Sequence, residues 1–247
     1  SDVYKRQVRG CWPVSISKVP SSSASNCRKI RFIGPSVVWG TMIDASNTAL
    51  VIEGGGMRNS YTAACMVKLI EEGVDFGWVG GVSAGASHTV NYLSRDARRA
   101  EESFTDFAQS PSFGGVGSLV RGTGYFNAEY IYERAADKDL PFDWQAYREH
   151  PADMVLAAAR ADTGESVYWT REDIHTPEDL FVRVRASSTL PLIMPMRFID
   201  GAPYVDGALG SSGGITIAQA EEAGYEKFLF IGTCLLYTSP SPRDGLL

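Results

Sequence analysis

The chain has 247 residues, with 23 Lys and Arg against 29 Asp and Glu, and four cysteines. An acidic chain lacks the basic face that nucleic acid requires, and the few cysteines provide no disulfide framework, which weakly favours a reducing compartment. No run of 18 apolar residues occurs, so the sequence predicts no membrane-spanning helix.

The two ends of the chain differ from the part between them. The first seven residues, SDVYKRQ, and the stretch CLLYTSPSPRD that begins at residue 234 can be encoded by reverse-complementary nucleotide sequences that resemble a transposon-end sequencing adapter. We therefore expect residues 1–41 to be adapter-derived and untranslated-leader sequence, and to be disordered, and residues 234–247 to be an adapter-derived tail. Residues 42–233 then form one acidic domain, truncated at its C-terminus.

The first half of this domain alternates strands with helices. Short apolar runs predict buried strands over 48–54 and 76–83. Helical spacing of apolar residues predicts a helix over 60–73, with Ser60 as its N-cap, and small residues open a second helix over 84–95. Strands that alternate with helices in this way predict a parallel sheet covered by helices.

The second half continues with both kinds of element. The expected elements are a charged helix over 97–108, a Gly-rich loop over 110–126, two strands joined by a turn over 153–170, a helix over 176–190, a hairpin over 196–208, a helix over 216–226 and a buried strand over 227–233. The loop at 110–126 is expected to be a surface loop, with a mobile lid over a site as the alternative.

The stretch GVSAG, residues 81–85, places Ser83 between a predicted strand and a predicted helix. In a G-x-S-x-G turn the serine hydroxyl projects from the carboxyl end of the sheet, and the flanking glycines allow the neighbouring chains to pack closely. The helix N-terminus adds positive potential where an oxyanion would form. We interpret Ser83 as a nucleophile, with a plain N-cap serine as the alternative.

The stretch GGGMR follows the preceding strand. In a parallel sheet Gly54, Gly55 and Gly56 would lie at the same carboxyl edge as Ser83, where their backbone N–H groups could stabilise the oxyanion of an ester under attack. A tight turn and a phosphate-binding loop are the alternatives. The segment lacks the G-K-[ST] ending of a P-loop and the spacing of a dinucleotide site.

The base that would activate Ser83 is either a histidine or a carboxylate. The three histidines, His88, His150 and His175, all precede Asp206, whereas the common hydrolase order places the histidine last, so we interpret them as surface residues. Asp206 ends a predicted strand and precedes Gly207. Taken alone, it is typical of an ordinary Asp-Gly turn.

Taken together, GGGMR, then GVSAG, then ASSTLP followed by VDGA resemble the patatin-like phospholipase family, in its bacterial branch, over essentially all of residues 48–233. The resemblance implies a three-layer α/β/α fold with a mainly parallel central sheet, and a catalytic dyad of Ser83 and Asp206 without a histidine. It also implies an oxyanion hole from Gly54, Gly55, Gly56 and Met57, with Arg58 beside it fixing the loop or adding positive potential.

Two positions depart from the family pattern. Asn59 follows Arg58 where the family often has glycine, and Ala208 stands where a second glycine is common. Both departures concern the shape of a turn and leave the residues of the proposed chemistry in place.

The predicted function is therefore a serine hydrolase of lipid esters, of the phospholipase A or lysophospholipase type. The alternatives are a non-catalytic lipid- or anion-binding domain with this fold, and an esterase whose histidine lies beyond the present C-terminus. We expect no cofactor and no metal, no nucleic acid partner, a lipid or lysophospholipid substrate, and a cytoplasmic protein with transient contact to membrane surfaces. The segment LPLIMPMRFI, residues 190–199, is either core or the lining of an acyl pocket.

Overall fold

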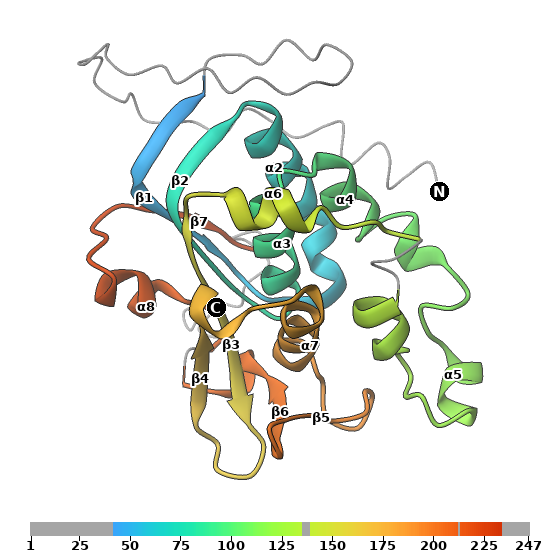
Figure 1. The fold of residues 1–247 in the computed structure, drawn as a ribbon. Helices are drawn as coiled ribbons and strands as arrows, with labels where there is room; N and C mark the ends of the chain where they lie inside the picture. The colour runs from blue at the N-terminus through green and yellow to red at the C-terminus, as the bar shows by residue number, and fades with distance from the viewer. Residues whose placement is uncertain (1–41, 135–138, 212, 234–247) are drawn as a thin grey trace, which may run out of the picture.

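A computed structural model describes residues 42–134, 139–211 and 213–233. The predictions for residues 1–41 and 234–247 concern sequence outside this described part. The described residues form an α/β fold around one seven-stranded sheet, in which six strands follow the order β5-β6-β3-β2-β1-β7 and β4 pairs with β3 (Figure 1).

Four neighbouring strands, up to one edge of the sheet, pair in parallel, as expected. They are β3 (Asp153–Arg160), β2 (Val74–Val82), β1 (Ile43–Ile52) and the edge strand β7 (Phe228–Ile231). Three shorter strands extend the sheet with antiparallel pairing: β4 (Ser166–Trp169), β5 (Arg197–Ile199) and β6 (Ala202–Asp206). The expected β3–β4 turn and the β5–β6 hairpin are both present.

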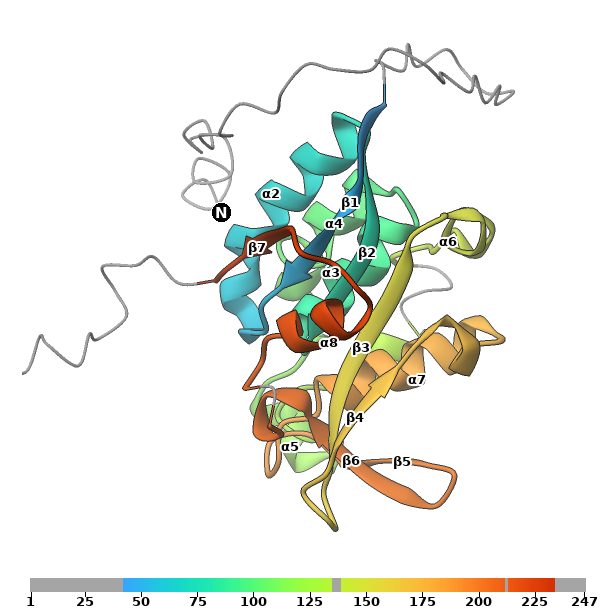
Figure 2. The same ribbon diagram turned by 90° about the vertical axis from the view of Figure 1, so that its left-hand side faces the viewer.

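Strand β3 brings the ends of β2 and β6 together. The last residue of β2, Val82, lies opposite Ala157, and the last residue of β6, Asp206, lies opposite Ala158. Strand β4 pairs with the same stretch of β3 and so occupies its other edge, which leaves β2 and β6 in line along one edge (Figure 2). Because β2 is parallel and β6 antiparallel to β3, their carboxyl ends meet.

Helices cover both faces of the sheet (Figures 1 and 2). One face carries α2 (Asn59–Glu71), α3 (Ala84–Leu93), α4 (Ala97–Glu102), α6 (Trp144–Glu149) and α7 (Pro177–Ser187). The other carries α8 (Ile217–Glu222). Alternation along β1 divides the core accordingly, since Leu50 and Ile52 pack with the first group while Ala49 and Val51 pack with Ala220 of α8.

Some boundaries differ from the sequence-based prediction. A short 3₁₀ turn, η1 (Gly56–Arg58), precedes α2, so Arg58 occupies the N-cap position and Ser60 is not the cap. The charged helix ends at Glu102 rather than at residue 108. By contrast, Thr176 caps α7 through a reciprocal pair of hydrogen bonds with Asp179, as its sequence predicts.

The segment between α4 and α6 contains more structure than a loop. It includes η2 (Phe107–Gln109), α5 (Val116–Val120) and a π-helical turn, η3 (Glu129–Arg134). Two further 3₁₀ turns follow later in the chain, η4 (Arg171–Asp173) and η5 (Gly207–Leu209). The predicted Gly-rich loop at 110–126 thus holds a short helix.

Candidate active site

Ser83 lies in a strained turn between β2 and α3. Its φ of 57° and ψ of −126° are unusual for a residue with a side chain. A Cβ atom on Gly81 would lie 2.3 Å from the carbonyl oxygen of Gly85, and one on Gly85 would lie 2.5 Å from that of Ile52. The two glycines of the motif are therefore required by backbone packing, which holds the turn against the end of β1.

Asp206 lies at the end of β6, where the meeting of the strand ends places it beside Ser83. The Ser83 hydroxyl and the Asp206 carboxylate lie close enough to interact. The carboxylate also accepts the N–H of Ala208 at 2.9 Å, and the Asp206 side chain is buried. Burial raises the pKa of Asp206 above its usual value, while the interactions with Ser83 and Ala208 act in the opposite direction.

The segment at the end of α7 holds both residues in place. The hydroxyl of Ser187 accepts the backbone N–H of Ser83 at 2.9 Å and donates to the carbonyl of Ala157 at 2.6 Å. Two residues later, the carbonyl of Thr189 accepts the backbone N–H of Asp206 at 2.8 Å. Sequence analysis assigned no role to these residues, because only the contacts with β3 and the turn after β2 distinguish them from other buried polar residues.

Each of the three consecutive glycines is favoured at its position by a different physical constraint. A Cβ atom on Gly54 would lie 3.2 Å from the Cβ of Ser83, and one on Gly55 would lie 2.7 Å from the hydroxyl of Thr233. Gly56 has open space around it but adopts a φ of 56°, which side chains disfavour. The loop therefore approaches the Ser83 turn as closely as a chain without side chains permits.

Two of the amides assigned to an oxyanion hole already have acceptors. The N–H of Gly54 donates to the carbonyl of Gly214 at 3.3 Å. With the Asn59 amide oriented so that both its atoms are satisfied, its oxygen accepts the N–H of Gly55 at 3.1 Å and its NH₂ donates to the carbonyl of Glu53 at 3.2 Å. The Asn59 side chain, at the position where the resemblance leads one to expect glycine, thus joins Glu53 and Gly55 within the loop.

The next part of the loop faces the pocket that contains Ser83. Gly56 and Met57 both line this pocket, and within the described part of the chain no acceptor takes their N–H groups. Arg58 donates its Nε to the carbonyl of Gly55 at 3.4 Å, and its backbone N–H donates to the same oxygen at 3.2 Å. This contact fixes the shape of the loop.

The pocket beside Ser83 is largely apolar. It extends under the segment between α4 and α6, and its walls include Phe104, Phe113, Phe126, Ile131, Leu190 and Met194. The stretch 190–199 is thus divided, because Leu190 and Met194 line the pocket while Leu192 is 98% exposed. The core interpretation applies only to Ile199, which packs against the main core, and is wrong for the exposed residues of the stretch, such as Leu192 and Phe198.

The three histidines lie away from the dyad contact, and two of them are not surface residues. His88 is completely buried, stacks on Phe104, and lies with Nε2 3.0 Å from the carbonyl of Asn59. Burial lowers the pKa of His88 to about 4 and that of His150 to about 3. The surface interpretation is therefore wrong for His88 and His150 and correct for His175, which is exposed.

The described residues hold neither a metal-binding cluster nor a membrane-spanning helix. Residues 42–134, 139–211 and 213–233 contain no cluster of three or more His, Cys, Asp or Glu placed to hold a metal ion. Over the same residues, no helix has the length and apolar character needed to span a bilayer.

Comparisons with known proteins identify the family of the chain. The sequence model of the patatin-like phospholipase family matches residues 50–218. An uncharacterised protein of Escherichia coli K12, YjjU, is 26% identical over 196 residues, which is 75% of this chain and 51% of that protein. VipD of Legionella pneumophila has a crystal structure that aligns with a TM-score of 0.41 and 14% identity, over 66% of this chain and 46% of VipD. The chain thus spans about half the length of these relatives.

Proposed function

The chain belongs to the patatin-like phospholipase family, and from this premise we propose that it is a serine acyl hydrolase of lipid esters, of the phospholipase A or lysophospholipase type. Ser83 is the nucleophile and Asp206 the base. The observation that carries the proposal is the approach of the Ser83 hydroxyl to the Asp206 carboxylate, in a buried position beside a largely apolar pocket. Such a pocket suits the acyl chain of a lipid.

In the first half of the reaction, the Ser83 oxygen attacks the ester carbonyl carbon while its proton passes to the Asp206 carboxylate. The tetrahedral oxyanion collapses, the bond to the leaving alcohol breaks, and the alkoxide takes the proton from Asp206. In the second half, water gives a proton to Asp206 and attacks the acyl-enzyme. Collapse of this intermediate releases the fatty acid and returns the proton to the Ser83 oxygen.

A carboxylate can act as this base because of where it lies. An ordinary aspartate, with a pKa near 3.9, takes a serine proton poorly. The raised pKa of buried Asp206 makes it a stronger base, and its closeness to the Ser83 hydroxyl places it in position for the transfer. This arrangement requires no histidine.

The oxyanion is stabilised by the glycine-rich loop. Gly56 and Met57 line the pocket, and their N–H groups, which have no acceptor among the described residues, are the donors of the proposed oxyanion hole. Gly54 allows the close approach to Ser83, and Gly55 allows the close approach to Thr233. Arg58 and Asn59 fix the loop geometry. Of the five residues of the predicted oxyanion hole, Gly56 and Met57 are thus the donors, and the other three maintain the shape and position of the loop.

Lipid enters the pocket at an exposed apolar rim, which we define by Val120 of α5 and Leu192. The carbonyl of Ile193 accepts the N–H groups of Tyr125 and Phe126, which joins the stretch 190–198 to the segment that carries α5. Val120 of α5 is 81% exposed and Leu192 is 98% exposed. We propose that this rim makes transient contact with a membrane surface while the substrate enters.

Labelling with a fluorophosphonate probe tests the dyad. Wild-type protein is expected to react at Ser83, while Ser83→Ala and Asp206→Asn lose labelling and reduce ester hydrolysis by roughly 10³-fold or more with the fold intact. Ser46→Ala and Asp162→Asn, which change an exposed serine and an exposed aspartate, serve as matched controls. Absence of labelling in folded wild-type protein would favour a non-catalytic lipid-binding domain. Near-full activity of Asp206→Asn would rule out the dyad.

A further inference from the structure

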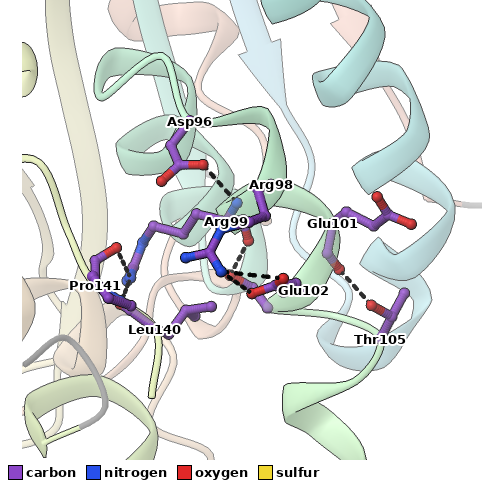
Figure 3. A network of polar contacts seen from close by, with 9 residues as sticks. Asp96, Arg98, Arg99, Glu101, Glu102, Thr105, Leu140 and Pro141 are labelled. Carbon is purple, nitrogen blue, oxygen red and sulfur yellow. Dashed lines mark hydrogen bonds and ion pairs between the residues drawn. The ribbon is translucent and has the colours of Figure 1, made fainter. Parts of the chain in front are cut away.

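The wall of the apolar pocket contains a buried cation. Arg99, on α4, lines the same pocket as Ser83 and is only 7% exposed. Figure 3 shows its side chain directed toward Leu140 and Pro141, away from the neighbouring Arg98, which is directed toward Glu102. An arginine in the wall of a largely apolar pocket requires an explanation, because burial of a charge is costly.

The partners of Arg99 are all neutral. Its Nε donates to the side-chain oxygen of Asn91 at 3.0 Å, and its Nη1 donates to the carbonyls of Leu140 and Pro141. The guanidinium also lies over the rings of Phe142 and Phe181, at 5.2 and 5.4 Å from their centroids. These contacts stabilise the side chain but bring no negative charge to it.

No carboxylate of the described residues forms an ion pair with Arg99. Asp96, the acidic group that raises its pKa, uses its side chain to accept the backbone N–H of Arg99 as a helix cap. Burial is the larger effect and lowers the pKa of Arg99 to about 10, so the guanidinium is charged at neutral pH. By contrast Arg185, which is equally buried, pairs with Glu133 at 2.5 Å.

The distance from Ser83 to Arg99 can be measured along α3. The N-cap residue Ser83 lines the pocket together with four residues of α3, which are Ala84, Ser87, Val90 and Asn91. Ser83, Ser87, Val90 and Asn91 follow one another along one face of the helix. Ser83 and Asn91 are eight residues apart, or about 12 Å along the axis. Arg99 bonds to Asn91 and therefore lies at the far end of this path.

An extended chain advances roughly 1.2 Å per bond, since three bonds of extended backbone span about 3.3–3.6 Å. A path of about 12 Å thus accommodates about eight to ten carbons between the Ser83 oxygen and the guanidinium. Nη2 of Arg99 has no acceptor among the described residues. An anionic group at the end of such a chain would find a charged donor there.

Building on the proposed acyl hydrolase function, we propose that this pocket selects acyl groups of about eight to ten carbons that end in a carboxylate, which pairs with Arg99. The substrate class is esters of medium-chain dicarboxylic acids or of similarly shortened, oxidised lipid chains. A neutral chain of the same length would place its methyl end against the guanidinium and the amide of Asn91, and would leave the charge unpaired.

Hydrolysis of two matched esters tests the proposal. The probes are the p-nitrophenyl monoester of nonanedioic acid, which has a free carboxylate at its far end, and p-nitrophenyl nonanoate, which has a methyl group there. Wild-type protein is expected to favour the first by about tenfold or more in kcat/KM, because a charge-assisted hydrogen bond in a buried site is strong. Arg99→Met is expected to abolish or reverse this preference.

Arg98→Met is the control, because Arg98 is the adjacent residue on the same helix, carries the same charge, and has a side chain that is 61% exposed. It is expected to keep the preference of the wild type. Arg99→Lys retains the charge and is expected to keep part of the preference, which covers the case in which Arg99→Met does not fold. Equal hydrolysis of both esters by wild-type protein would overturn the proposal while leaving the acyl hydrolase function intact.

A binding measurement separates this inference from the catalytic one. Monomethyl nonanedioate is titrated by calorimetry into Ser83→Ala, which cannot hydrolyse it, and into the double variant that also carries Arg99→Met. Binding to the first that weakens about tenfold or more in the second supports the pocket assignment even if no esterase activity exists. Equal binding to both variants would overturn it, whatever the activity.

Discussion

At the residue scale, the position of Asp206 determines how its charge affects stability. Its carboxylate is buried and its pKa is raised by that burial, while its interactions with Ser83 and Ala208 oppose the effect. A carboxyl group with a raised folded-state pKa favours folding below its unfolded pKa, and this contribution is lost as the pH rises through the folded pKa. At neutral pH the ionised Asp206 therefore lowers the stability of the fold.

Asp206→Asn is accordingly expected to raise the melting temperature at pH 7, and the gain should shrink as the pH falls toward and below 3.8, the usual value for this carboxyl group. Thermal unfolding followed by circular dichroism at several pH values measures it. Asp162→Asn should show no such gain, since Arg160 lowers the pKa of exposed Asp162 by a hydrogen bond. A lower melting temperature for Asp206→Asn at pH 7 would contradict this account.

The same environment determines the pH dependence of catalysis. Only the ionised form of Asp206 can accept the Ser83 proton, so activity should fall on the acidic side as Asp206 becomes protonated. Because burial raises this pKa, the loss should begin at a higher pH than for an ordinary aspartate. The profile of kcat/KM for a water-soluble ester measures the midpoint, and a midpoint below 3.8 would contradict the assignment.

At the scale of elements, the junction of β1, β2 and α3 depends on close backbone contacts. Gly85 opens α3 with the carbonyl of Ile52 in the space that its own Cβ would occupy. Close packing of this kind cannot relax by movement of a flexible side chain, because the obstructing atom belongs to a backbone in the centre of the sheet. The turn that holds Ser83 therefore tolerates no side chain at this position.

Gly85→Ala is expected to destabilise the protein by about 3 kcal/mol or more, at the upper end of overpacking effects. Gly117→Ala is the matched control, because Gly117 lies within α5 and its added Cβ would meet only the end of the Arg121 side chain at 3.4 Å. That change should be neutral or stabilise by about 0.5–1 kcal/mol, since alanine is the better helix former. Urea denaturation compares the two, and similar stability for both variants would refute the close-packing argument.

At the scale of the whole molecule, exposed apolar side chains gather near the pocket. Val116, Leu119 and Val120 on α5, and Leu192 on the stretch joined to it, are all more than half exposed. Ile43, at the opposite end of β1, is exposed to a similar degree as Leu119, and β1 separates it from the carboxyl edge where Ser83 lies. A substitution at Ile43 therefore serves as a control for substitutions of exposed apolar residues near the pocket.

Leu192→Asp and Val120→Asp are expected to weaken binding to phosphatidylcholine vesicles, because each places a charge on the proposed contact surface. Ile43→Asp should leave vesicle binding unchanged. Co-sedimentation measures the bound fraction, and hydrolysis of a water-soluble ester checks that the pocket remains intact. Equal binding by the three variants would place the membrane contact elsewhere.

Much of the fold could be predicted from the sequence, because its evidence is local. The Thr176 cap, the turn between β3 and β4, and the strand–turn–helix around Ser83 each depend on residues within a few positions of one another. The family resemblance rests on the same short motifs, and the match over residues 50–218 confirms it. The roles of Ser83, Asp206 and the glycine-rich loop remain predictions that the geometry supports.

The sequence by itself thus determined which residues form each turn, because glycine adopts backbone conformations that other residues disfavour, and serine and aspartate side chains bond to nearby backbone N–H groups. Only the tertiary structure decided that β6 runs against β3 and so brings Asp206 to the end of β2. It also decided that Ser187 supports Ser83 and that Arg99 lies in the pocket wall. These facts depend on contacts between residues far apart in the chain, which the packing of the sheet and helices creates and no local pattern encodes.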